Sequence, residues 1–143
     1  YGFMVRLGEL YARNKAGKAV LAVPENARVL PPVPVGRETA GRVAAVTNTG
    51  RLLMFPLGEL PQLARGKGNK IIGIPGARAK AREEYVAALA CVPEGAVLTL
   101  YSGQRHLTLK PADMDGYLGE RGQRGGKLPR GFQRVERMVA GET

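Results

Sequence analysis

A segment of about fifty residues recurs along this chain, and the repeat limits the possible folds more than any other feature. Leu7–Leu10, with the sequence LGEL, returns as the same four residues at 57–60, an offset of 50. A basic turn at 15–18 returns at 67–70, and a third, weaker copy ends in a basic turn at 124–127. Because one short unit cannot bury its apolar face alone, repeats of this length predict modules that stack against their neighbours.

Each repeat is predicted to contain four short antiparallel strands. Residues 42–47 and 96–101 have the apolar and β-branched composition of strands, and a glycine-containing turn follows each of them. After a second strand comes a connector with the basic turn, then an apolar strand (20–24 and 71–75) and a last strand such as 85–92. Four short strands in a repeat of roughly 40–50 residues are typical of propellers. We therefore predict an all-β fold of propeller-like blades.

The repeat divides the chain into three predicted blades. Residues 1–36 form a truncated blade, 37–93 form a complete blade, and 94–143 form a complete blade with an arginine- and glycine-rich ribbon. Residues 76–84, rich in alanine and of mixed charge, are predicted to be an exposed insertion, either a short helix or disordered. Two complete blades and a truncated one are too few for a closed ring. We expect a partial ring, with Tyr1 at the start of a piece excised from a larger disc.

The positive charge of the chain is concentrated around the basic turns. Lysine and arginine number 22 against 12 acidic residues, which gives a net charge of +10. Segments 13–18, 65–70 and 120–137 carry +3, +3 and +4, while the rest of the chain has ten bases and ten acids. Such an excess predicts a polyanionic partner, either nucleic acid or an anionic membrane surface. No apolar run approaches the roughly 18 residues of a membrane span.

The basic turns have the residue types that bind phosphate. Glycines among the lysines and arginines let the backbone approach closely and donate N–H groups to phosphate oxygens, and the side chains supply the counter-charge. In the third segment, four glycines and a proline between 122 and 131 favour a turn-rich ribbon, since each glycine costs a helix roughly 1 kcal/mol and an interior proline about 3. For any one turn alone, a solvated loop remains an alternative, so the functional prediction depends on the repetition.

The other reactive residues form no recognisable catalytic or metal site. His106 lies in a predicted strand without a carboxylate or cysteine beside it, and Cys91 is predicted to be a small buried hydrophobic residue. Glu83 and Glu84 are adjacent but have no partner base, so we expect both to be solvated. Neither a Walker-type loop nor a nucleophile elbow is present in the sequence. We expect no catalytic residue, cofactor or metal in this segment.

Several motifs resemble one known family. The runs 50–56 (GRLLMFP), 65–72 (RGKGNKII) and 119–126 (GERGQRGG) closely resemble the C-terminal domain of the A-subunit of bacterial DNA topoisomerase IV, a type IIA topoisomerase related to gyrase. The resemblance covers essentially the whole chain. The related gyrase domain has a Gln-Arg-Arg-Gly-Gly-Lys-Gly box, whereas residues 123–128 here have one arginine fewer and lack the final glycine. This difference favours the topoisomerase IV branch over gyrase-like wrapping.

The resemblance implies a β-pinwheel, in which propeller-like blades exchange strands and a basic outer rim binds and bends duplex DNA without sequence specificity. The basic residues that match this rim are Arg13, Lys15, Lys18, Arg51, Arg65, Lys67, Lys70, Arg121, Arg124, Lys127, Arg130 and Arg134. Two alternatives remain open, an RNA-binding basic β-module and a propeller scaffold for protein partners. Three Phe and five Tyr with no Trp offer little base stacking for an RNA module.

The resemblance also implies a parent enzyme, an ATP-dependent isomerase that decatenates replicated chromosomes for segregation and relaxes supercoils. ATP on the partner B-subunit, like magnesium at the cleavage site, would lie in other regions, and this segment would be non-catalytic. The implied partners are duplex DNA, the remainder of the A-subunit, the B-subunit in a heterotetramer, and a condensin-type protein. The implied location is the bacterial cytoplasm, at the nucleoid. None of the five tyrosines lies in the context of the family's nucleophile.

Overall fold

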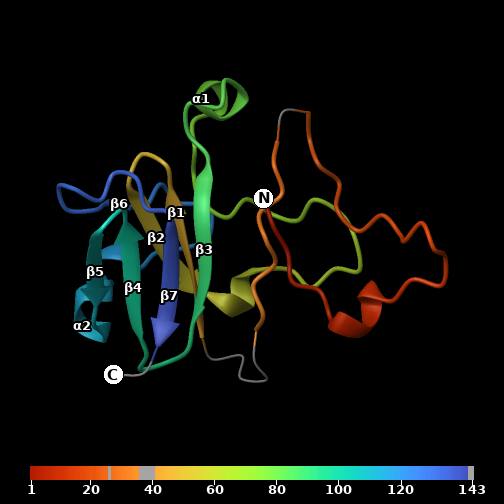
Figure 1. The fold of residues 1–143 in the computed structure, drawn as a ribbon, viewed down its shortest axis with the longest axis horizontal. Helices are drawn as coiled ribbons and strands as arrows, with labels where there is room; N and C mark the ends of the chain where they lie inside the picture. Colours follow the sequence, from red (N-terminus) through yellow and green to blue (C-terminus); the bar gives the residue numbers. More distant parts are fainter. Residues whose placement is uncertain (26, 36–40, 142–143) are drawn as a thin grey trace.

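Two antiparallel sheets form the centre of the protein (Figure 1). The computed structural model describes residues 1–25, 27–35 and 41–141. The first sheet has the strand order β3-β1-β2-β6, and the second has the order β5-β4-β7. The strands are β1 (Arg42–Thr47), β2 (Arg51–Pro56), β3 (Val86–Val92), β4 (Val97–Ser102), β5 (Arg105–Leu109), β6 (Gly126–Lys127) and β7 (Arg137–Gly141).

Short helical turns connect the strands. They are η1 (Leu7–Leu10), η2 (Leu57–Glu59), α1 (Gly76–Lys80), α2 (Pro111–Met114) and η3 (Asp115–Tyr117). The predicted insertion at 76–84 therefore begins with a short helix, α1, and is not disordered. Across the described ranges, the helices are too short or too polar to cross a membrane.

Both predicted hairpins are present. β1 pairs with β2, with Val43 opposite Phe55, and β4 pairs with β5 in the same antiparallel manner. Gly50 ends the first turn with φ +86, a left-handed conformation that a residue with a side chain rarely adopts. The predicted strands agree with β1, β3 and β4 to within one residue at each end.

The two sheets are joined by an exchanged strand. β6 pairs with the edge of β2, with Lys127 opposite Arg51 and Gly126 opposite Leu52. The chain thus leaves the second sheet after β5, completes the first sheet with β6, and returns to the second sheet as β7. This is the exchange between neighbouring blades that a pinwheel requires. The exact blade boundaries stay a prediction, because a sheet here takes strands from both sides of the boundary at residue 93.

Gly125 allows β6 to approach β2. Its φ is +80, and a Cβ atom added to it would lie 2.7 Å from the carbonyl oxygen of Leu52. We expect Gly125→Ala to lower the free energy of unfolding by about 2 kcal/mol in urea titrations, through left-handed backbone strain and displacement of β6. Gly103→Ala is the control, since Gly103 has φ +61 but nothing lies within 4 Å of its added Cβ. Equal losses in the two variants would contradict this role of Gly125.

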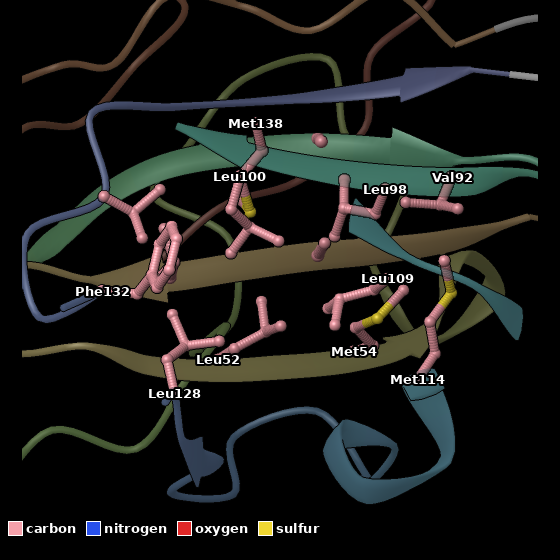
Figure 2. Packing of buried hydrophobic residues seen from close by; sticks show 14 residues of the cluster. Leu52, Met54, Val92, Leu98, Leu100, Leu109, Met114, Leu128, Phe132 and Met138 are labelled. Atoms are coloured by element: carbon pink, nitrogen blue, oxygen red, sulfur yellow. The ribbon is translucent and has the colours of Figure 1, made fainter. Parts of the chain in front are cut away.

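The first sheet is buried on both faces. On one face, alternate residues of β1 and β2 pack against the second sheet, in the cluster that Figure 2 shows. On the other face, Val43, Phe55 and Leu57 pack with Ile71 and Ile72. Burial on both faces explains why β1 and β2 are apolar at nearly every position and do not alternate.

The strands predicted at 20–24 and 71–75 are wrong. Both stretches contain no strand, although Leu21 makes one isolated bridge. Ile71 is buried as its apolar character indicated, but its carbonyl oxygen accepts a hydrogen bond from Gly122 N, at 2.9 Å, in a turn. The apolar residues of 71–75 therefore indicate burial in the core. They do not form a strand, because the backbone beside them is a turn and offers no strand to pair with.

The amino-terminal segment lies beside the connector that follows η2 (Figure 1). Isolated bridges join Gly2 to Asn69 and Met4 to Gln62. Leu7 of η1 is 86% exposed, whereas its repeat counterpart Leu57 is 2% exposed. The difference has a local cause, since Leu57 packs with the β1–β2 hairpin and no hairpin covers Leu7 among the residues that the structure describes.

Candidate nucleic-acid interface

The first basic turn (residues 13–18) and the second basic turn (residues 65–70) belong to neighbouring stretches of backbone. Gly66 N donates to the carbonyl oxygen of Val20 at 2.8 Å, and Ala22 N donates to the carbonyl oxygen of Gly66 at 3.0 Å. These bonds fix the chain just after the first turn against the middle of the second. Two turns that are about fifty residues apart in sequence therefore lie close together in space.

We extend the third basic turn, predicted at 124–127, to residues 121–127 because Arg121 and Gly122 belong to the same loop. This turn is hydrogen bonded to the end of the second. Arg121 Nη1 donates to the carbonyl oxygen of Lys70 at 2.9 Å, and Gly122 N donates to that of Ile71. Two residues further on, Gly73 N donates to the carbonyl oxygen of Gln123 at 2.6 Å. The three basic turns thus follow one another in space in the order of the repeat. Hydrogen bonds from the chain just after the first turn reach the second turn, and hydrogen bonds from the third turn reach the end of the second.

Most of the predicted DNA-contact residues present an exposed cationic side chain. The exposed residues are Arg13, Lys15, Lys18, Arg65, Lys67, Lys70, Lys127, Arg130 and Arg134. Within the described ranges, none of these nine side chains forms an ion pair with a carboxylate. Lys67 Nζ lies 3.9 Å from the centroid of the Tyr1 ring, a contact that leaves its positive charge in place. The exposed side chains therefore keep their charge available to phosphate groups.

The remaining three predicted contacts, Arg51, Arg121 and Arg124, are partly buried and have donors engaged inside the protein. Arg51 Nη1 donates to the carbonyl oxygen of Gly125 at 3.2 Å. Arg121 Nε donates to that of Glu59 at 3.0 Å, in addition to its bond with Lys70. Arg124 Nη1 donates to the carbonyl oxygen of Gly73 at 3.1 Å. These arginines connect separate parts of the chain, so we assign them a structural role that the sequence pattern did not reveal.

Glu84 is fully buried, and the prediction that it is solvated is wrong. Its carboxylate accepts hydrogen bonds from Arg124 Nη2, at 2.6 Å to Oε2, and from Thr49 Oγ1 at 2.9 Å. Burial by itself raises the pKa of Glu84, but the hydrogen bonds from Arg124 and Thr49 and the charge of Arg124 outweigh burial and hold the pKa below its ordinary value. Nothing in the sequence distinguished Glu84 from its exposed neighbour Glu83.

The whole chain matches one group of known proteins. It is 55% identical over 139 residues, 97% of its length, to the A-subunit of DNA topoisomerase 4 from Pseudomonas aeruginosa. It is 46% identical over 138 residues, 96% of its length, to the corresponding protein from Escherichia coli. The solved structure of the E. coli ParC C-terminal domain matches all of the chain, with a TM-score of 0.87 and 45% identity. The chain belongs to the family of DNA topoisomerase IV A-subunits.

The match to the topoisomerase IV family is to a part of those proteins. The chain spans 18% of the length of each of the two curated relatives and 57% of the solved E. coli domain. A second solved structure, of the C-terminal domain of DNA topoisomerase IV, shares the fold at 14% identity, with a TM-score of 0.56 over 82% of this chain and 41% of that one. No protein-family model matches the chain. The resemblance and the fold class predicted from the sequence are thus confirmed.

In this topoisomerase IV segment, the residues that resemble the gyrase box have packing roles. Gln123 Oε1 accepts a hydrogen bond from Glu120 N at 3.0 Å, which closes the turn. Arg124 donates hydrogen bonds to the carbonyl oxygen of Gly73 and to the carboxylate of Glu84, and Gly125 lies against Leu52 of β2. The box-like segment therefore connects the third turn to the first sheet within one chain.

Among the residues that the structure describes, the other reactive side chains do not gather in one site. Cys91 was predicted to be buried but is half-buried, packed against the apolar cluster that contains Phe55, and this burial raises the pKa of its thiol. Burial, with the charge of Asp113, also raises the pKa of the Tyr117 phenol. His106 is exposed on β5. In the part of the chain that the structure describes, no three His, Cys, Asp or Glu side chains gather as a metal site requires.

Proposed function

We propose that this domain binds duplex DNA without sequence specificity and bends it. The observation that supports the proposal is the hydrogen-bonded succession of three basic turns, whose exposed cations form no ion pairs among the described residues. Lysine and arginine contacts to phosphate supply affinity without reading bases. Turns that follow one another along one edge can contact phosphates at successive positions of a curved duplex.

Contacts of lysine and arginine with phosphate can offset the free energy that is needed to bend the DNA. Bending a site of 20–30 bp by 40–90° costs of order 1–6 kcal/mol, which several phosphate contacts can offset. A bent duplex held on this edge would be the segment that the enzyme transports through a second duplex. The handedness of that bend would bias which crossings of DNA are selected.

We extend the proposal to the parent enzyme because similar proteins are topoisomerase IV subunits. In that context the domain would serve ATP-dependent decatenation and supercoil relaxation by a type IIA topoisomerase. It would act with the remainder of the A-subunit, together with the B-subunit, in the bacterial cytoplasm at the nucleoid. ATP and magnesium would bind in other regions, and a condensin-type protein would be a further partner.

The salt dependence of DNA binding tests the proposal. Each neutralised phosphate contributes about 0.9 to the slope of log K against log salt concentration, so the basic turns together should contribute a slope of magnitude on the order of 5–8. Fluorescence anisotropy with a labelled duplex would measure the slope between 50 and 200 mM salt. Over that interval a slope of this size lowers the affinity by about 10³-fold to 10⁵-fold. A slope near zero would contradict the proposal.

Competition distinguishes the alternatives. If the domain is a duplex-binding module, unlabelled duplex DNA should displace the labelled duplex more effectively than single-stranded RNA of equal length. Stronger displacement by RNA would indicate the RNA-binding module, in which aromatic residues stack on bases. A partner that binds with an affinity independent of salt would instead indicate a protein scaffold.

A further inference from the structure

The segment from Ile74 to Tyr85 projects from the first sheet and carries α1 at its tip (Figure 1). We call it the α1 projection. Its sequence contains three basic residues and two acidic residues, so the charge is nearly balanced in the sequence. The structure changes that balance, because Glu84 is buried against Arg124 of the third basic turn. Arg78, Lys80 and a single acid, Glu83, remain exposed, and Arg82 is partly buried over the Tyr85 ring.

Both ends of the α1 projection are fixed to the third basic turn. Arg124 Nη1 donates to the carbonyl oxygen of Gly73, just before the projection, and Nη2 donates to Glu84 at its end. Asn48 adds two bonds at the same base, from Nδ2 to the carbonyl oxygen of Glu83 at 3.1 Å and from Tyr85 N to Oδ1 at 2.8 Å. The projection therefore has a defined position relative to the basic turns.

The tip of the α1 projection presents cations without apolar anchors. Arg78 and Lys80 are exposed, and the residues between and beside them are Ala77, Ala79 and Ala81. The only ion pair of the tip in the described structure joins Arg78 Nε to Glu83 at 4.0 Å, and it is too exposed to neutralise the arginine strongly. Protein interfaces are centred on large apolar or aromatic anchors, whereas the residues beside the tip cations are alanines. Tyr85 lies at the base of the projection, where the Arg82 guanidinium covers its ring at 4.4 Å from the centroid.

The geometry of α1 suits the groove of a duplex. Positions two apart on an α-helix are separated by about 200° around its axis, so Arg78 and Lys80 extend to opposite sides of the tip. The major groove is about 12 Å wide and admits a helix, with a phosphate backbone on either side. Small alanine side chains allow close approach, and they offer no hydrogen-bonding group to read a base.

We propose that the α1 projection is an additional DNA contact, which enters a groove of the bound duplex and places Arg78 and Lys80 against phosphates of opposite strands. The inference rests on the proposed function, because it extends the same duplex beyond the three basic turns. It also assigns a role to Arg124 and Glu84, which hold the projection in place and do not themselves touch DNA.

The test compares two double variants of the intact protein with equal loss of charge. Arg78→Ala/Lys80→Ala should lower the magnitude of the salt slope by about 1.8 and weaken duplex binding about 10-fold or more at 0.1 M salt. Alanine favours the helix, so α1 should persist. The control is Arg42→Ala/Lys110→Ala, two exposed residues at the ends of the strands far from α1, and it should change affinity less than about 2-fold.

A variant with the opposite effect makes the test sharper. Glu83→Gln removes the one exposed acid of the tip and should tighten duplex binding by about 2-fold to 3-fold. If the wild-type protein binds duplex DNA but the two double variants bind alike, the inference is wrong and the proposed function stands. If the wild-type protein shows no salt-dependent duplex binding, both proposals are wrong.

Discussion

Arg124→Ala is expected to lower the free energy of unfolding by about 3–5 kcal/mol, because it leaves the buried carboxylate of Glu84 without its cationic partner. Thr49 Oγ1 would be the one remaining side-chain donor to Glu84 among the described residues. The bond to Gly73 would be lost as well, so the base of the α1 projection would loosen. Urea unfolding monitored by circular dichroism would measure the change in midpoint.

Two comparisons isolate the cause. Arg130→Ala removes the same side chain from an exposed position of the same ribbon, and it should change stability by less than about 0.5 kcal/mol. Replacing both Arg124 and Glu84 with leucine removes the two charges together. This double variant should recover a large part of the lost stability, because apolar residues can often replace a buried ion pair without destabilising a protein. If Arg124→Ala costs no more than Arg130→Ala, the buried pair does not stabilise the domain.

The pH dependence of this loss follows from the pKa of Glu84. In the wild-type protein that pKa lies below the ordinary value of 4.5, so the pair stabilises the fold above that pH, and its contribution is lost as the pH falls through the folded-state pKa. Without Arg124, burial raises the pKa above the unfolded value, and protonation then relieves the penalty. The difference in unfolding free energy between the two proteins should be largest at neutral pH and shrink in acid.

Local sequence chemistry predicted the hairpins, because their turns contain glycine at a position that needs positive φ. Gly50, at φ +86, ends the turn between β1 and β2, and Gly103, at φ +61, begins the two-residue turn between β4 and β5. The connector at 71–75 could not be predicted in the same way. Its isoleucines are buried like those of a strand, but their backbone partner lies in a turn about fifty residues later, and no local pattern encodes that pairing.

In the candidate site, too, the sequence predicted features that depend on local residues but not those that depend on contacts between distant parts of the chain. The repeat predicted that the basic turns would be equivalent, and hydrogen bonds do join them in order. The sequence did not show which arginines face solvent. Arg124 and Arg130 both lie in the same basic ribbon, yet Arg124 pairs with a glutamate forty residues earlier and Arg130 is exposed. Such a distinction depends on tertiary contacts, which the charge pattern alone does not contain.

Reversing the charge of the second basic turn should have the largest effect on DNA. The triple variant Arg65→Glu/Lys67→Glu/Lys70→Glu removes three cations and adds three anions beside the first and third turns. Loss of three phosphate contacts lowers the magnitude of the salt slope by about 2.7. Repulsion between the new glutamates and the phosphates weakens binding further, so duplex affinity at 0.1 M salt should fall on the order of a thousand-fold. Decatenation by the intact enzyme should fall with it.

The fold should tolerate this reversal, which makes the variant informative. All three side chains are exposed, and the contact of Lys70 with Arg121 uses the Lys70 carbonyl oxygen, which the substitution retains. Loss of the Lys67 contact with the Tyr1 ring should cost no more than about 1 kcal/mol. Arg42→Glu/Lys110→Glu reverses two exposed charges outside the three basic turns and serves as the control. Unchanged duplex affinity and decatenation in the triple variant, with an unchanged unfolding midpoint, would show that duplex DNA does not follow this edge.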